Sequence, residues 1–253
     1  MARYFIRLSY CGTAYNGWQS QPHKGTITIQ STIENALHTY LRKDIPITGC
    51  GRTDTGVHAK DYIAHFDFEP LDDIPTIIHR LNRVLPDDIA IHDIYRVKDD
   101  AHARFNAISR SYQYRLHTNK SPFKPYSYFY FYDTPDLSVL NQTANLLLEY
   151  TDFTTFCKLH SGAKTMDCHL TESAWIKNGE DYTYKVTSDR FLRGMIRLIV
   201  GMCLQVARGK ASLEEVKNAL NNQDRLSQDW SVPAIGLMLC DIQYPDTIKW
   251  YES

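Results

Sequence analysis

Residues 4–10 read Tyr-Phe-Ile-Arg-Leu-Ser-Tyr, and this stretch sets the first element of the fold. Large side chains at positions 4, 6, 8 and 10 share one side of an extended chain, which predicts a half-buried strand. Ser31 and Glu34 have the spacing of a capping box, so a helix is expected from about Thr32 to Leu41. The elements expected next are strands at 45–50 and 62–68, a helix at 74–84 and a strand at 89–97. This β-α-β-β-α-β order is typical of a ferredoxin-like unit, an antiparallel sheet with helices on one face.

The chain after Asp99 and Asp100 alternates strands and helices a second time. The elements expected there are strands at 109–116, 168–177, 182–187 and 236–243, and helices at 137–149, 191–207 and 213–219. We therefore predict an α+β protein with an N-terminal domain of residues 1–103 and a C-terminal domain of residues 104–253. Two ferredoxin-like halves are expected to form one continuous, mostly antiparallel sheet with helices packed on it and a central cleft.

The composition is that of a folded protein of one or two domains. Of the 253 residues, 43% are hydrophobic and 23% are charged, close to globular averages. No apolar run approaches the ~18 residues of a membrane helix, and the first residues lack an apolar signal core, so neither a membrane span nor secretion is expected. The six cysteines form no C-x-x-C pair, which argues against a zinc site and a disulfide framework and favours the cytoplasm.

Charge is segregated along the chain, although the net charge is only −1. Residues 101–132 hold five basic side chains and no acid, and residues 185–210 hold six against Asp189 alone. Residues 67–100 carry nine acids and four bases. This polarity fits a nearly neutral protein with one cationic face, and an ordinary solvated surface is the alternative. The basic residues of the two segments are Arg104, Arg110, Arg115, Lys120 and Lys124, and Lys185, Arg190, Arg193, Arg197, Arg208 and Lys210.

The densest group of unusual residues is Gly-Cys-Gly-Arg-Thr-Asp-Thr-Gly-Val-His-Ala at residues 49–59. Glycine permits positive φ and close backbone approach, so this loop can present the Asp54 carboxylate into a cleft. An ordinary turn with a structural Asp is the alternative. Residues 54–56, Asp-Thr-Gly, also match the triplet of aspartic proteases, in which two such carboxylates share a proton. Only one copy is present and no apolar strand end precedes it, so a protease would need a homodimer to supply the second carboxylate.

In its full length this loop resembles the G-x-G-R-T-D-x-G-V-H-A signature of the tRNA pseudouridine synthase A family, in which the Asp is catalytic. The resemblance extends along nearly the whole chain. Residues 10–21, Tyr-Cys-Gly-Thr-Ala-Tyr-Asn-Gly-Trp-Gln-Ser-Gln, are similar to the family's Y-D-G-T-x-Y-x-G-W-Q-x-Q, with Cys11 in place of the usual Asp. Further matching stretches are residues 29–37, 102–105, 109–114, 152–156, 191–201 and 233–237.

The resemblance implies an enzyme that isomerises uridine to pseudouridine. Asp54 would be the nucleophile, attacking the uracil ring or the ribose, or abstracting a sugar proton after bond cleavage; the sequence does not choose among these. Arg197 lies within an apolar helical run and matches the family arginine that contacts the catalytic Asp, although an amphipathic helix could carry it on its surface. Tyr112 matches the active-site tyrosine, which can stack on uracil and assist proton transfer.

The resemblance also implies how the substrate is bound. Arg52 is expected to fill the space left by the extruded nucleotide, Leu237 to line the pocket, and Arg104 and Arg110 to bind substrate. His58 is expected to stabilise the loop rather than to catalyse. The implied substrate is the anticodon stem-loop of tRNA at positions 38, 39 and 40, with no metal and no organic cofactor, in a cytoplasmic homodimer without membrane attachment. A catalytically idle RNA-binding module is the rival interpretation.

Overall fold

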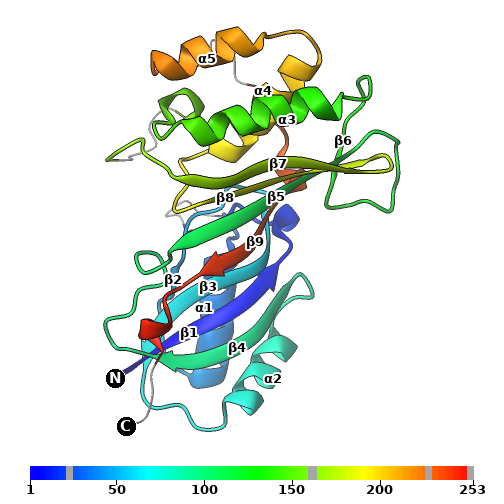
Figure 1. The fold of residues 1–253 in the computed structure, drawn as a ribbon. Helices are drawn as coiled ribbons and strands as arrows, with labels where there is room; N and C mark the ends of the chain where they lie inside the picture. The colour runs from blue at the N-terminus through cyan, green and yellow to red at the C-terminus, as the bar shows by residue number, and fades with distance from the viewer. Residues whose placement is uncertain (21–24, 159–163, 226–229, 250–253) are drawn as a thin grey trace. The chain divides into compact units, whose positions relative to one another are not determined.

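The computed structural model describes residues 1–20, 25–158, 164–225 and 230–249. The chain divides into two compact units (Figure 1). Unit 1 comprises Met1–Ile108 and Met238–Ser253, and unit 2 comprises Ser109–Leu237. Both units combine helices with strands, so the α+β class is confirmed. Strand pairing within the units is antiparallel except for β3 with β9 and β5 with β6.

Unit 1 is built on a central pair of long strands, β1 (Ala2–Tyr10) and β3 (His58–Phe68). β4 (Ile89–Val97) pairs with the other edge of β1, while β2 (Thr48–Gly49) and β9 (Leu237–Gln243) pair with opposite ends of β3. Two helices, α1 (Ile29–Leu41) and α2 (Ile74–Val84), lie on one face of these strands (Figure 1). The core between the layers contains Ile6, Leu8, Tyr62, Ile33 and Leu81, each at most 1% exposed.

The start of α1 differs from the expected one. The helix begins at Ile29, because the Thr28 hydroxyl accepts a hydrogen bond from the Ser31 amide at 3.2 Å. In return, the Thr28 amide donates to the Ser31 hydroxyl at 3.3 Å. The capping box expected for Ser31 and Glu34 is therefore wrong. The Glu34 carboxylate instead accepts hydrogen bonds from Gln30 and from the Ile47 amide, both at 3.0 Å, which ties α1 to the chain entering β2.

Unit 2 contains the antiparallel strands β5 (Ser109–His117), β8 (Asp181–Ser188) and β7 (Leu170–Asn178) in that order. A short strand that the sequence did not indicate, β6 (Tyr128–Phe129), pairs in parallel with the end of β5. Its helices are α3 (Leu137–Leu146), α4 (Met195–Ala207) and α5 (Leu213–Asn221). Alternate residues of β8 are buried, among them Tyr182, Tyr184 and Val186, so one face of the strands packs into the core.

The helix expected from residue 191 begins only at Met195. Gly194 precedes it with φ +73°, a left-handed conformation that keeps residues 191–193 outside the helix. None of the helices in the described parts of the chain is long and apolar enough to span a bilayer. Within the same parts, His, Cys, Asp and Glu side chains form no group of three that could hold a metal ion.

Candidate active site

Asp54 lies in the loop that joins β2 to β3 in unit 1. The loop turns tightly after this residue, since the Val57 amide donates to the Asp54 carbonyl at 3.2 Å and Gly56 has φ +79°. Asp54 is half-buried and Arg52 is exposed, whereas Thr53 between them is buried. The loop is therefore anchored in unit 1 through the buried Thr53, whereas Arg52 and Asp54 on either side of it are accessible to solvent.

The segment that contains Gly17 and Trp18 packs against the backbone of the Asp54 loop. The Trp18 amide donates to the Thr53 carbonyl at 3.2 Å. Gly17 has φ +86°, and a Cβ at this position would lie 2.5 Å from the Thr53 carbonyl oxygen and 3.2 Å from the Asp54 carbonyl carbon. Only glycine permits this backbone approach, which explains why the chain has Gly17 immediately before Trp18.

Three aromatic side chains complete this support. Trp18 stacks on Tyr62 with ring centroids 3.9 Å apart, and Tyr10 packs against both rings. The hydroxyls of Tyr10 and Thr53 are hydrogen-bonded at 2.8 Å, and the Tyr62 hydroxyl donates to the Gly51 carbonyl. Tyr10, Gly17 and Trp18 thus have a structural function, because they fix the loop that carries Asp54.

Two further residues of this region, His58 and Cys11, form hydrogen bonds with the backbone of neighbouring segments. His58 is 2% exposed, and its Nδ1 accepts a hydrogen bond from the Gly12 amide at 3.1 Å, as expected for a loop-stabilising residue. Cys11 packs its sulfur 3.4 Å from the Thr13 hydroxyl, and its amide donates to the Asp88 carbonyl at 2.8 Å. Cys11 therefore serves here as a small link between β1 and the start of β4, where the matched signature has a carboxylate.

Arg104 follows β4 in a compact turn of unit 1. The His102 Nδ1 accepts hydrogen bonds from the amides of Arg104 at 3.1 Å and Phe105 at 3.4 Å, and the buried His65 accepts one from the Ala103 amide at 3.2 Å. The Phe105 ring is 74% exposed, and the Arg104 guanidinium lies 5.7 Å from its centroid. The turn therefore presents a cation beside an exposed aromatic ring.

Arg197 lies in the first turns of α4 in unit 2. It is half-buried, and its Nε donates to the Val232 carbonyl at 2.7 Å, while the Val232 amide donates back to the Arg197 carbonyl at 3.3 Å. Gly201, one turn on, permits close approach of the same segment, because a Cβ there would lie 1.8 Å from the Trp230 carbonyl oxygen. Helix α4 and residues 230–232 thus form one packed element that orients the guanidinium.

Tyr112 lies on β5 and is half-buried, with its ring edge-on to Phe191 at 5.3 Å. Its neighbour Tyr114 is fully buried and donates its hydroxyl to the Pro233 carbonyl at 2.9 Å. Burial raises the pKa of Tyr114, and the nearby Arg197 opposes this shift. The Arg110 Nη1 donates to the Asp189 carbonyl at 2.8 Å, and Leu237 is 6% exposed at the start of β9.

The predicted site residues therefore fall into two groups. Asp54, Arg52 and Arg104 belong to unit 1, whereas Tyr112, Arg197, Arg110 and Leu237 belong to unit 2. Within unit 2, both Arg197 and Tyr112 are related to Tyr114. The charge of Arg197 opposes the rise that burial causes in the pKa of Tyr114, and Tyr112 lies two residues before Tyr114 on β5. The pairing of Asp54 with Arg197 and Tyr112 stays a prediction.

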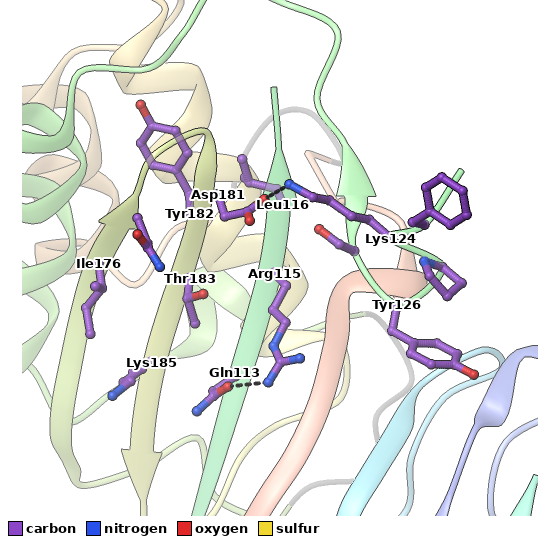
Figure 2. A pocket seen from close by; sticks show the side chains of 14 residues that line it. Gln113, Arg115, Leu116, Lys124, Tyr126, Ile176, Asp181, Tyr182, Thr183 and Lys185 are labelled. Atoms are coloured by element: carbon purple, nitrogen blue, oxygen red, sulfur yellow. Dashed lines mark hydrogen bonds and ion pairs between the residues drawn. The ribbon is translucent and has the colours of Figure 1, made fainter. Parts of the chain in front are cut away.

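Unit 2 also contains a pocket that sequence reasoning missed, with a volume of about 580 Å³ (Figure 2). It is lined by residues of β5, β8 and β7 and by the segment 123–127 that follows β5. No feature of the sequence indicates this pocket beyond the basic charge of two distant segments, because the pocket depends on the pairing of Gln113 with Lys185 across 72 residues.

The chain is similar to known proteins over its whole length. A family model described as tRNA pseudouridine synthase matches residues 145–245. A tRNA pseudouridine synthase A from Bacteroides thetaiotaomicron is 45% identical over 100% of this chain and 94% of its own length. The proteins of the same name from Parabacteroides distasonis and Bacillus subtilis are 42% and 34% identical, over 98% and 94% of this chain and 98% and 97% of their own lengths.

Proposed function

The chain belongs to the tRNA pseudouridine synthase A family, and from that premise we propose that it isomerises uridine to pseudouridine in tRNA. The observation that carries the proposal is the braced Asp54 loop in a chain that matches its relatives end to end. A rigid loop that presents one carboxylate fits this chemistry, since a nucleophile must engage a nucleotide that the protein holds in place.

The reaction breaks the bond between uracil N1 and ribose C1′ and forms a bond between uracil C5 and C1′. A proton leaves C5 and a proton is gained at N1, so the reaction has no net oxidation or reduction. In our proposal Asp54 forms the covalent intermediate or abstracts the sugar proton, and the Arg197 guanidinium stabilises its charge. Tyr112 stacks on the uracil and assists proton transfer.

We further propose the finer features of this enzyme. Each unit forms a ferredoxin-like half, and in unit 1 the pairing order β4, β1, β3, β2 supports this interpretation. The substrate uridines are at positions 38, 39 and 40 of the anticodon stem-loop. Arg52, Arg104, Arg110 and Leu237 contact the RNA, and the protein acts in the cytoplasm as a homodimer.

The test is incubation of the protein with unmodified tRNA transcripts, followed by chemical mapping of pseudouridine. We expect modification at one or more of positions 38, 39 and 40, and none in transcripts with cytidine at all three. Modification elsewhere would contradict the proposed positions but not the reaction. Binding of tRNA with no pseudouridine at any position would favour the idle RNA-binding module. Sedimentation equilibrium tests the homodimer, which has twice the 29.3 kDa mass of the chain.

A further inference from the structure

The pocket of unit 2 lies on the face of the β5, β8 and β7 strands whose side chains point away from the core (Figure 2). Along these strands, residues that line the pocket alternate with buried residues of the core. On β5, Tyr114 is buried and Arg115 is exposed, and on β8, Tyr184 is buried while Lys185 is partly exposed. Gln113 lies opposite Lys185 and Arg115 opposite Thr183. Arg115 and Lys185 are therefore diagonal neighbours, about 7–8 Å apart at their Cα atoms.

The lining of this pocket is net positive, with three basic residues, Arg115, Lys124 and Lys185, and one acid, Asp181. Among the described residues, Lys124 forms an ion pair with Asp181, the one acid in the lining. Arg115 donates to the Gln113 side-chain oxygen at 3.2 Å, which leaves its positive charge uncompensated by a carboxylate (Figure 2). No ion pair involves Lys185 in the part of the chain that the structure describes. Neither of these two positive charges forms an ion pair with a carboxylate of the described residues.

Exposed apolar side chains border these charges. The Phe123 ring is 89% exposed, and Ile176 and Tyr126 are 47% and 45% exposed. All three line the same pocket. Apolar groups gathered in this way on a surface mark a binding site more often than a plain surface. Cations beside open aromatic rings suit a nucleic acid, because phosphates pair with the cations and bases stack on the rings.

We propose that this pocket binds a stretch of the RNA substrate outside the reacting uridine. Arg115 and Lys185 contact its phosphates, and the exposed ring of Phe123 stacks on one of its bases. The assignment is to binding and not to chemistry, because the one carboxylate of the lining, Asp181, is held by Lys124. The inference rests on the proposed function for the identity of the ligand as tRNA.

The charge part of this proposal is tested with the double variant Arg115→Gln, Lys185→Gln. Affinity for a tRNA transcript is measured at several salt concentrations, with Lys177→Gln as the matched control. Lys177 lies on β7 opposite the buried Tyr182, so its side chain projects from the other face of the same strands. Two lost phosphate contacts reduce the slope of log affinity against log salt by about 1.4–1.8. The same loss weakens binding about 25- to 60-fold at ~0.1 M salt.

The control is expected to keep the wild-type slope. A double variant with the slope of the wild type would overturn the proposal, and so would an equal reduction in Lys177→Gln, which would show a non-specific effect of net charge. The single-turnover rate of pseudouridine formation at saturating enzyme should stay within about twofold of wild type, because only binding is altered. Wild-type protein that binds tRNA without modifying it would defeat the proposed function, yet the slopes would still decide the present inference.

The stacking part is tested with Phe123→Ala against Phe123→Tyr. Loss of one stacked base weakens binding about 5- to 150-fold, whereas tyrosine keeps a ring and is expected to bind within about twofold of wild type. The sedimentation mass of both variants is measured in parallel. Equal affinities for alanine and tyrosine variants would contradict stacking. A fall in the mass of Phe123→Ala alone would identify the face as a contact between copies of the chain and would likewise overturn the RNA assignment.

Discussion

Gly17 shows how a single residue positions the loop that carries Asp54, the proposed nucleophile. Its φ of +86° and its approach to Thr53 are available to glycine alone, and the Thr53 to Asp54 backbone rests directly on it. Gly25 has nearly the same φ, +87°, but no described atom lies within 4 Å of a Cβ built there. Substitutions at Gly17 and Gly25 therefore distinguish the effect of backbone strain from the effect of contact with the Asp54 loop.

We expect Gly17→Ala to impair catalysis much more than Gly25→Ala. Both substitutions incur about 1–2 kcal/mol of backbone strain, and Gly17→Ala adds about 1–3 kcal/mol of steric overlap. Displacement of Asp54 by about 1 Å is expected to lower the single-turnover rate about 100-fold. Urea unfolding and rate measurements on both variants test this, and equal rates would show that the loop does not depend on the contact.

His65 makes stability depend on pH. Burial, with the neighbouring His102 and Arg3, lowers its pKa from 6.5 to about 4. The unfolded chain binds this proton near pH 6.5 and the folded protein only near pH 4, so the free energy of unfolding decreases as the pH falls between these values. The decrease attributable to His65 is at most about 3 kcal/mol.

Urea unfolding at several pH values from 7 to 4 tests this assignment. In His65→Gln, the free energy of unfolding should decrease less between pH 7 and pH 4 than in the wild type, whatever the stability of the variant at pH 7. His79→Gln, which changes an exposed side chain on α2, should leave the decline as in the wild type. An unchanged decline in His65→Gln would assign the acid sensitivity to other groups.

At the scale of elements, α4 and residues 230–232 act together. Val232 and Arg197 exchange two hydrogen bonds, and Gly201 lets the helix approach the Trp230 carbonyl. Arg197→Met keeps the apolar stem of the side chain and loses the Nε bond and the charge. We expect it to lower stability by only about 1–2 kcal/mol and pseudouridine formation at least 100-fold.

Arg197→Lys is the matched variant for this prediction, because it keeps the charge but cannot reproduce the planar guanidinium. An intermediate rate for lysine is expected if the charge itself supports Asp54. Unfolding curves are recorded alongside the single-turnover rates. Full activity in Arg197→Met would show that this arginine only anchors the segment 230–232.

Element boundaries were predictable where the signals are local. Asp73 caps α2 and Pro86 follows it, and both bounds of α2, Ile74 and Val84, agree with the sequence. The start of α1 was not predictable, because Thr28 and Ser31 offer a second capping box and Glu34 is drawn into a contact with Ile47. The loop that carries Asp54 was visible in the sequence since its residues are contiguous. The unit 2 pocket was not, since it depends on strand pairing between distant segments.

At the scale of the whole molecule, our proposals assign chemistry and RNA affinity to different residues. One carboxylate, Asp54, is proposed for the chemical step, whereas the basic residues of segments 101–132 and 185–210 are spread over several elements. The antiparallel pairing of β5 with β8 brings part of these two segments together. Phosphate contacts of this kind supply most of the affinity for RNA and little of its sequence specificity.

Asp54→Asn should separate these two properties. Asparagine keeps the size of the side chain and removes the nucleophilic charge, so pseudouridine formation is expected to fall below detection. Affinity for tRNA should stay within about threefold of wild type, with an unchanged salt slope, because no phosphate contact is removed. Asp87→Asn, an exposed carboxylate with the same change of charge, is the control and should retain full activity. Single-turnover rates and binding titrations at fixed salt decide the matter. Wild-type turnover in Asp54→Asn would refute the assigned nucleophile, and parallel loss of binding and turnover would show that the loop supports the RNA surface and not the chemical step alone.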